Sequence, residues 1–262
     1  MIEKVIEAFK EFNEVDAMLL GGSRATGIFD DKSDYDVYVY LNKPLHESKR
    51  KEVLKNLCSS MEYSNHFWEL EDDGTLNNGI EIELIYRKAD FFESIIKNMK
   101  EMNVGNGYST CFYDNLVNSI ILFDKSGKIS DLQSKNKGLI SDEFVQTIID
   151  ANFPLIYEST PALYWQVQKA MGRQDYNSVN HRLSEYFAIY YDILFGLNKT
   201  SHPGEKKLIK IATSLEFIPK NFRDKVHKVF FNSYENSELS LKNLYLLSKD
   251  IEKLIIDLGY KI

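Results

Sequence analysis

The chain has little cysteine and no long apolar run. Its two cysteines, Cys58 and Cys111, are too few for a disulfide framework or a zinc site with four cysteine ligands. No apolar stretch approaches the length that spans a bilayer, and the first residues lack the basic region and apolar run of a signal peptide. These absences predict a soluble, reduced, cytoplasmic protein with no membrane partner.

Basic side chains are also in deficit. The chain has 32 Lys and Arg against 39 Asp and Glu, a net charge of −7. Residues 1–140 carry 17 basic and 24 acidic side chains, and residues 141–262 carry 15 of each. A protein that binds the phosphate backbone of a nucleic acid needs a basic face, so we do not expect nucleic acid as the main partner. Metal ions or a cationic small molecule suit this balance better.

The first half of the chain has the pattern of an α/β module. Hydrophobic residues make up 44% of the 262 residues, enough for a substantial core. The periodicity predicts helices around residues 2–9, 46–59 and 89–101, and strands at 17–20, 34–40, 67–70, 80–86 and 119–123. Turns are expected at Asp72-Asp73-Gly74 and at Asn77-Asn78-Gly79, and residues 24–32 read as a short helix or loop.

The second half has no strand pattern. Helices are predicted near residues 142–151, 160–171, 176–197, 205–214, 222–231 and 237–257, with prolines between them at Pro154, Pro161, Pro203 and Pro219. The boundary between the two modules is expected between residues 127 and 141.

A glycine-rich loop follows the first predicted strand. Gly21-Gly22-Ser23 offers backbone N–H groups without side chains in the way, and Ser23 adds a hydroxyl donor. A helix beginning here would add favourable dipole charge for an anion. Such loops are common, so the loop alone is weak evidence for a phosphate site.

Two pairs of carboxylates strengthen that evidence. Strand alternation places Asp34 and Asp36 on one face, and Glu81 and Glu83 on one face of a later strand. If these strands are neighbours, three carboxylates converge beside the loop. Oxygen ligands of this kind suit Mg²⁺ or Mn²⁺, and two such ions serve phosphoryl or nucleotidyl transfer. An exposed, solvated strand face is the alternative for either pair.

The spacing of these residues resembles that of the polymerase-β-like nucleotidyltransferase superfamily. Gly22-Ser23, ten residues, and then Asp34-Tyr35-Asp36 are similar to its signature, and Glu83-Leu84-Ile85-Tyr86-Arg87 to the strand of its third carboxylate. Thr26 departs from the pattern, since many members have a basic residue there. The match covers residues 20–87. The whole layout resembles bacterial lincosamide and aminoglycoside nucleotidyltransferases.

The resemblance implies an α+β fold in two domains. Residues 1–135 would form a polymerase-β-like α/β catalytic domain with a small mixed sheet, and residues 136–262 an all-α helical-bundle domain that binds the substrate. Related antibiotic enzymes often build their site between subunits, so a homodimer is compatible with the resemblance.

The resemblance also assigns roles to the residues of the motif. Gly21, Gly22, Ser23 and Arg24 would bind a nucleoside triphosphate. Asp34, Asp36 and Glu83 would ligate Mg²⁺ or Mn²⁺ and form the catalytic group, with Glu81 in reserve for Glu83. The implied reaction transfers a nucleoside monophosphate, AMP from ATP, to a hydroxyl of a small molecule. Lincosamide and aminoglycoside antibiotics lead the acceptor classes, which would make the chain an antibiotic-resistance enzyme.

Two other functions remain open. One is an adenylyltransferase that modifies a protein or RNA, as in toxin–antitoxin pairs, and the low net basicity counts against RNA. The other is a nucleotide-binding protein without catalysis, which has little need for three converging carboxylates. In the helical half, four cations could reach a triphosphate or pair with acidic residues on helix surfaces: Arg173, Arg182, Lys206 and Lys207. Five aromatic residues could pack in the core or line an acceptor pocket: Tyr164, Trp165, Tyr186, Tyr190 and Tyr191.

Overall fold

The computed structural model describes residues 1–27, 29–31 and 33–262. Ile28 and Lys32, inside the stretch 24–32 that was expected to form a short helix or loop, lie outside the described residues. The chain forms two compact units, residues 1–97 with 112–137 and residues 98–111 with 138–262. The assignment of residues 1–135 to catalysis and 136–262 to substrate binding stays a prediction.

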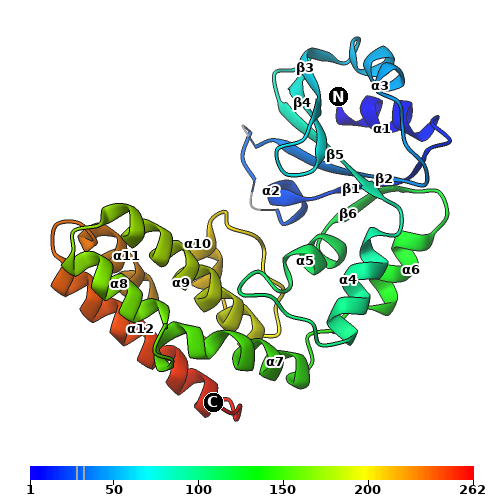
Figure 1. Ribbon diagram of the computed structural model, residues 1–262. Helices are drawn as coiled ribbons and strands as arrows, with labels where there is room; N and C mark the ends of the chain where they lie inside the picture. The colour runs from blue at the N-terminus through cyan, green and yellow to red at the C-terminus, as the bar shows by residue number, and fades with distance from the viewer. Residues whose placement is uncertain (28, 32) are drawn as a thin grey trace. The chain divides into compact units, whose positions relative to one another are not determined.

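The first unit contains a six-stranded mixed sheet in the order β3-β4-β5-β2-β1-β6 (Figure 1). Its strands are β1 (Val15–Leu20), β2 (Tyr35–Leu41), β3 (Cys58–Asn65), β4 (Leu70–Leu76), β5 (Glu81–Lys88) and β6 (Ile120–Asp124). Its helices are α1 (Ile2–Lys10), α2 (Gly22–Ala25), α3 (Glu47–Leu54) and α6 (Lys128–Lys135), and α4 (Phe91–Lys100) and α5 (Cys111–Val117) straddle the limits of the unit. The pair β2–β5 is parallel, and every other neighbouring pair is antiparallel. The predicted α+β fold with a small mixed sheet is therefore confirmed.

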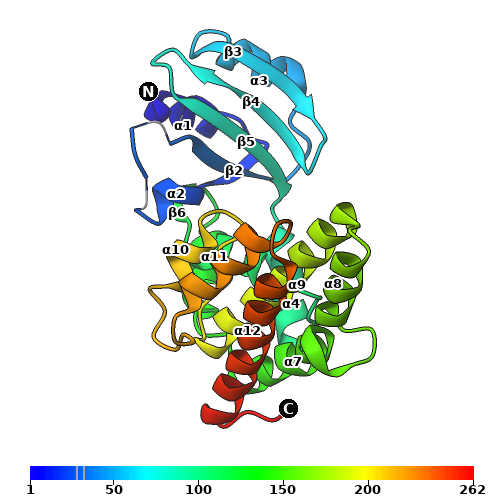
Figure 2. The ribbon, with the colours of Figure 1, turned by 90° about the vertical axis from the view of Figure 1, so that its left-hand side faces the viewer.

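One face of this sheet forms the core with α1 and α3. These two helices lie together over the sheet (Figures 1 and 2). Val5 and Phe9 of α1 pack with Val37 and Val39 of β2. On the opposite face Tyr40 packs against Phe92, with ring centroids 5.1 Å apart. Alternation along β2 thus buries valine on one side and leaves the other side for polar and aromatic groups.

The region between residues 55 and 76 differs from the sequence prediction. The predicted helix 46–59 ends at Leu54, and β3 begins at Cys58. Of the predicted strand 67–70, only Leu70 belongs to a strand, as the first residue of β4. Residues 67–69 lie in the connection between β3 and β4, where Phe67 and Trp68 are 81% and 92% exposed. The predicted turn at residues 72–74 is strand interior. Gly74 is needed there because a Cβ would lie 2.3 Å from the backbone oxygen of Ser60 on β3.

A buried ion pair explains why this turn is a strand. The Arg50 guanidinium of α3 donates to the Asp72 carboxylate, and both side chains are almost fully buried. Tyr86 Oη and the backbone N–H of Ser64 also donate to Asp72, at 2.8 and 2.9 Å. Because these partners come from three other segments, Asp72 is satisfied only when the sheet has formed.

Asp72→Asn should lower the free energy of unfolding by about 3–5 kcal/mol, because it leaves the Arg50 charge buried without its partner. The neighbouring control Asp73→Asn, which changes a partly exposed side chain, should cost less than about 1 kcal/mol. Chemical denaturation of the full chain measures both. Equal costs for the two variants would contradict the structural role of the pair.

The second unit is helical around a central helix. It contains α7 (Asp142–Phe153), the π-helical turn η1 (Pro154–Glu158), α8 (Leu163–Gly172), α9 (Tyr176–Leu197), α10 (Leu208–Ala212), α11 (Phe222–Asn232) and α12 (Ser237–Asp257). α9 contacts α7, α8, α10 and α12, and α12 lies along α11 and α8 (Figure 2). The predicted helical module is confirmed. Among the described residues, no helix is both long and apolar enough to cross a membrane.

A buried polar centre attaches the segment 98–111 to this unit. Asp192 of α9 accepts hydrogen bonds from the backbone N–H and the Oγ of Ser109, at 2.8 and 2.6 Å. The backbone N–H of His202 donates to Thr110 Oγ1 at 2.8 Å, and its ring packs against Tyr108 and Phe195. The segment is therefore held by specific polar contacts.

Burial acts in opposite directions on the two titratable groups of this centre. Burial raises the pKa of Asp192 to about 6 although the hydrogen bonds from Ser109 lower it. Burial lowers the pKa of His202 to about 4. Between about pH 4 and 6 the folded chain holds a proton on Asp192 that the unfolded chain loses, so this group makes stability fall as pH rises. The unfolded chain holds a proton on His202 up to about pH 6.5, so this group makes stability rise with pH.

The contributions of these two groups should nearly cancel in the unmodified chain between pH 4 and 6. His202→Gln leaves the contribution of Asp192, so its thermal unfolding midpoint should fall relative to that of the unmodified chain from pH 4 to 6. Asp192→Asn leaves the contribution of His202, so its midpoint should rise relative to that of the unmodified chain over the same range. Thermal unfolding across pH 4–7 measures the three slopes, and identical profiles in all three proteins would refute the opposed shifts.

Candidate functional site

Three carboxylates meet where β2 and β5 run side by side. Asp34 directly precedes β2, Asp36 lies on β2, and Glu83 lies opposite Asp36 in the parallel β2–β5 register. One carboxylate oxygen from each lies within 4.8 Å of the others, and all three side chains are partly buried. Sequence spacing predicts that the carboxylates of each strand share a face. The structure adds that the two strands are neighbours.

The register also decides which glutamate joins the group. Glu83 faces Asp36, whereas Glu81 lies two residues earlier on β5, opposite Thr75 of β4, and is exposed. The sequence left this choice open because a two-residue error in the register would exchange the two. In the structure Glu83 completes the group with Asp34 and Asp36.

The carboxylates continue as a row across the sheet. In the antiparallel registers Asp73 of β4 lies opposite Glu83, and Glu62 of β3 lies opposite Asp73. Asn65 Nδ2 donates to Asp73 at 2.6 Å and to Glu62 at 3.4 Å. We call Asp36, Glu83, Asp73 and Glu62 the acidic row. Sequence reasoning missed its outer half because residues 72–74 read as a turn.

The glycine loop touches the carboxylate group directly. Gly22 has a left-handed backbone, with φ of +60°, and a Cβ there would lie 1.7 Å from Asp36 Oδ2. The backbone N–H of Gly21 donates to the Asp36 carbonyl at 2.8 Å. α2 has only four residues, so a helix dipole adds little to this loop. Gly22 therefore lets the loop backbone lie close to the Asp36 carboxylate, and Gly21 lets it lie close to the Tyr38 ring.

Arg24 holds the segment before β2 in place. Its Nε donates to the carbonyls of Ser33 and Asp34 at 3.0 and 2.9 Å, and its Nη2 donates to Ser33 at 2.6 Å. The guanidinium carbon lies 4.1 Å from the centre of the Tyr35 ring. Arg24 was predicted to bind nucleotide. Its contacts in the structure fix the backbone that carries Asp34, and nucleotide binding by this side chain stays a prediction.

Arg87 extends the same strand face beyond Glu83. Its guanidinium is almost fully buried and donates to both Glu69 oxygens, at 2.8 and 2.6 Å, and to Asn115 at 3.1 Å. The guanidinium carbon also lies 4.2 Å from the centre of the Tyr38 ring. The sequence analysis placed Arg87 on the strand that carries Glu83 but gave it no role. Its hydrogen-bond partners come from other segments, so no local pattern reveals them.

Comparison with known families gives a match within the first unit. Residues 3–91, which contain the loop and all three carboxylates, match the family described as polymerase beta, nucleotidyltransferase. This part of the chain is therefore similar to a nucleotidyltransferase domain of the polymerase-β family. Comparison with curated protein sequences gives no match.

Solved structures give distant similarities over nearly the whole chain. One is a nucleotidyltransferase-like protein from Exiguobacterium sibiricum 255-15, at 9% identity and a TM-score of 0.42 over 97% of this chain and 73% of that chain. Another is an aminoglycoside 6-adenyltransferase from Bacillus subtilis, at 12% identity and a TM-score of 0.35 over 98% of this chain and 89% of that chain. A third is the Thermotoga maritima CCA-adding enzyme complexed with tRNA, at 11% identity and 0.31 over 98% and 80%. At these scores none of the three supports an assignment of substrate.

Gly22→Ala should disrupt the carboxylate group, because the new Cβ would collide with Asp36. We expect at least about 10-fold weaker Mn²⁺ binding, measured by calorimetry. Gly27→Ala is the matched control. Gly27 also has a left-handed backbone, with φ of +74°, but a Cβ there meets nothing within 4 Å. Both variants should lose about 1 kcal/mol of stability, and unchanged Mn²⁺ affinity in Gly22→Ala would contradict the geometry.

Proposed function

We propose that the chain is a metal-dependent nucleotidyltransferase that transfers a nucleoside monophosphate, AMP from ATP, to a hydroxyl of a small molecule. The observation that carries the proposal is the group of Asp34, Asp36 and Glu83, whose carboxylate oxygens lie within 4.8 Å of one another. Three like charges this close repel one another, and a cation relieves that repulsion. A protein that only binds nucleotide has little need for such a group.

The donor set fits Mg²⁺ or Mn²⁺. All three ligands are carboxylates, and such hard oxygen donors favour these ions over zinc. When bound, the ions supply positive charge for the triphosphate and the reacting oxygens. Asp34 and Asp36 would hold two ions together, and Glu83 would complete the coordination of one of them.

The chain's own groups position the reactants. The backbone of Gly21, Gly22 and Ser23 would receive the phosphates close to Asp36. Arg24 would keep the Asp34 backbone rigid through its bonds to the carbonyls of residues 33 and 34. The acceptor hydroxyl oxygen bonds to the α-phosphorus, the bond from that phosphorus to pyrophosphate breaks, and a carboxylate, Glu83 or a neighbour, takes the hydroxyl proton.

The acidic row supports a cationic acceptor. Asp73 and Glu62 extend the negative charge from Glu83 across β4 and β3. An acceptor with amino groups would be attracted there. Lincosamides and aminoglycosides, named by the sequence resemblance, are therefore the first acceptors to test. A protein or RNA acceptor is the alternative.

Glu83→Gln and Asp36→Asn should each reduce acceptor-dependent pyrophosphate release by more than roughly 100-fold. Loss of a residue that only orients a metal ligand typically costs roughly 10–100-fold, and these residues are proposed to be ligands themselves. Glu81→Gln, on the same face of the same strand, should retain activity within about twofold. The assay offers ATP, GTP, CTP and UTP with Mg²⁺ to pooled antibiotics, and Asp34→Asn/Asp36→Asn serves as the inactive control.

The outcomes separate the proposals. Release that requires both an antibiotic and Glu83 supports the small-molecule transferase and names its substrates. Equal loss in Glu81→Gln would refute the assignment of the group. Triphosphate binding without release on any antibiotic would refute the small-molecule acceptor and favour a macromolecular one or a binding protein.

A further inference from the structure

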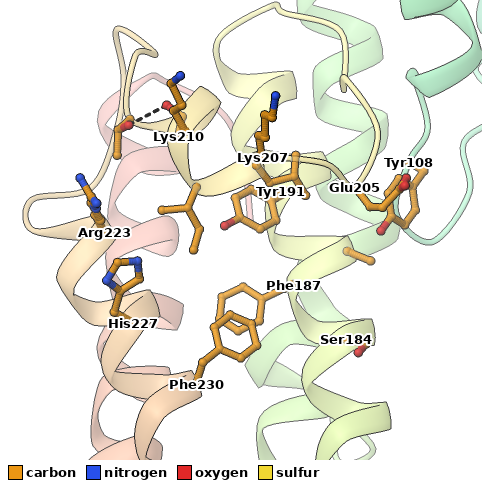
Figure 3. Close-up of a pocket in the computed structure, with 14 residues that line it drawn as sticks. Tyr108, Ser184, Phe187, Tyr191, Glu205, Lys207, Lys210, Arg223, His227 and Phe230 are labelled. Carbon is orange, nitrogen blue, oxygen red and sulfur yellow. Dashed lines mark hydrogen bonds between the residues drawn. The ribbon is translucent and has the colours of Figure 1, made fainter. Parts of the chain in front are cut away.

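The helical unit contains a cavity with chemistry opposite to that of the acidic row. Its volume is about 760 Å³, within the range of small-molecule sites. Residues of α9, α10 and α11 line it, together with loop residues that flank α10 and with Tyr108 (Figure 3). Every lining residue belongs to the unit of residues 98–111 and 138–262. The cavity is therefore a property of this unit alone.

Positive charge gathers around the cavity. Lys207, Lys210 and Arg223 line it against a single carboxylate, Glu205, and His227 adds an imidazole. Arg223 and His227 lie four residues apart on α11, so they share a face (Figure 3). In a chain with a net charge of −7, this is a local reversal of sign.

Arg223 is the most informative of these cations. Within residues 1–27, 29–31 and 33–262 no carboxylate pairs with its guanidinium, whereas Lys225 and Lys228 on the same helix pair with Asp250 and Asp224. Arg223 also lies in the first turn of α11, where the helix dipole disfavours a positive charge. An anion bound in the cavity would compensate both effects.

Aromatic rings form the floor. Phe187 of α9 and Phe230 of α11 stack with centroids 4.7 Å apart and planes at 29°, and Figure 3 shows them below Tyr191. Phe230 is 45% exposed, although such a large apolar side chain gains free energy when covered. A planar or apolar ring would fit against this floor.

The opposite wall is fixed in place. Tyr108 and Lys207 both have left-handed backbones, with φ of +57° and +59°, which side chains other than glycine rarely adopt. Next to Tyr108, the Ser109 N–H and Oγ are tied to buried Asp192. The part of the wall at Tyr108 is therefore held to a buried residue of the unit.

We propose that this cavity binds a small organic anion that carries a planar ring. The anionic group would lie near Arg223 and His227, with Lys207 and Lys210 at the rim, and the ring would stack on Phe187 and Phe230. The site goes beyond the proposed nucleotidyl transfer and does not depend on it. Polyamine acceptors do not suit its lining.

Calorimetry with the full-length chain and two probes of equal ring size tests the proposal. 2-Naphthyl phosphate should bind, and 2-naphthylmethylammonium should bind at least about 10-fold more weakly. Arg223→Gln should weaken binding of the phosphate about 10-fold or more, since it removes a charged hydrogen-bond donor. Lys220→Gln removes the same charge outside the cavity and should change affinity less than twofold.

A second pair of variants tests the floor. Phe230→Ala should weaken binding of 2-naphthyl phosphate about 10-fold. The Phe231 side chain is 78% exposed and does not line the cavity, so Phe231→Ala should leave binding unchanged. Equal affinity for the two probes, equal effects within either matched pair, or undetectable binding of the phosphate would overturn the proposal. Asp36→Asn should bind the probe like the unmodified chain. Loss of binding in that variant would place the probe at the carboxylate group and also overturn it.

Discussion

The site depends on one constraint, the parallel register between β2 and β5 in a sheet whose other pairs are antiparallel. That register sets Asp36 beside Glu83, and a shift by one residue would turn Glu83 to the core face. The valines of β2 and Ile82 and Leu84 of β5 prevent the shift, because they must reach the apolar core with α1 and α3. Hydrophobic packing on one face of the sheet thus holds like charges together on the other, where electrostatics alone would separate them.

Much of the fold could be predicted because its signals are local. Alternation predicted β2 and β5, helical periodicity predicted α1 and the helices of the second unit, and the spacing of Asp34 and Asp36 predicted that they share a face. The prediction of an element was wrong where partners distant in the sequence decide the conformation. Asp72 lies in a stretch with turn composition, yet Arg50 and Tyr86 make it strand interior. The acidic row was missed with it, since its members meet only through pairing of β3, β4 and β5.

The binding surfaces of the two units have opposite electrostatic character. The sheet of the first unit carries a row of carboxylates that suits metal ions and amines. The cavity of the second unit is lined by cations over an aromatic floor. This contrast between the units is not visible in the total charge. The residues after residue 140 include 15 basic and 15 acidic side chains, so their net charge does not reveal the positive cavity. Folding, by bringing α10 and α11 against α9, separates charges that the sequence intermixes.

The chain crosses between its two units three times, because residues 98–111 leave the first unit and return to it at residue 112. The helical unit is therefore not a single continuous segment of the chain. A recombination event that replaced only the residues after 137 would remove Asp192 and leave the N–H and the Oγ of Ser109 without their buried acceptor. Replacement of the whole helical unit therefore requires the exchange of two separated segments, residues 98–111 and residues 138–262, in one step.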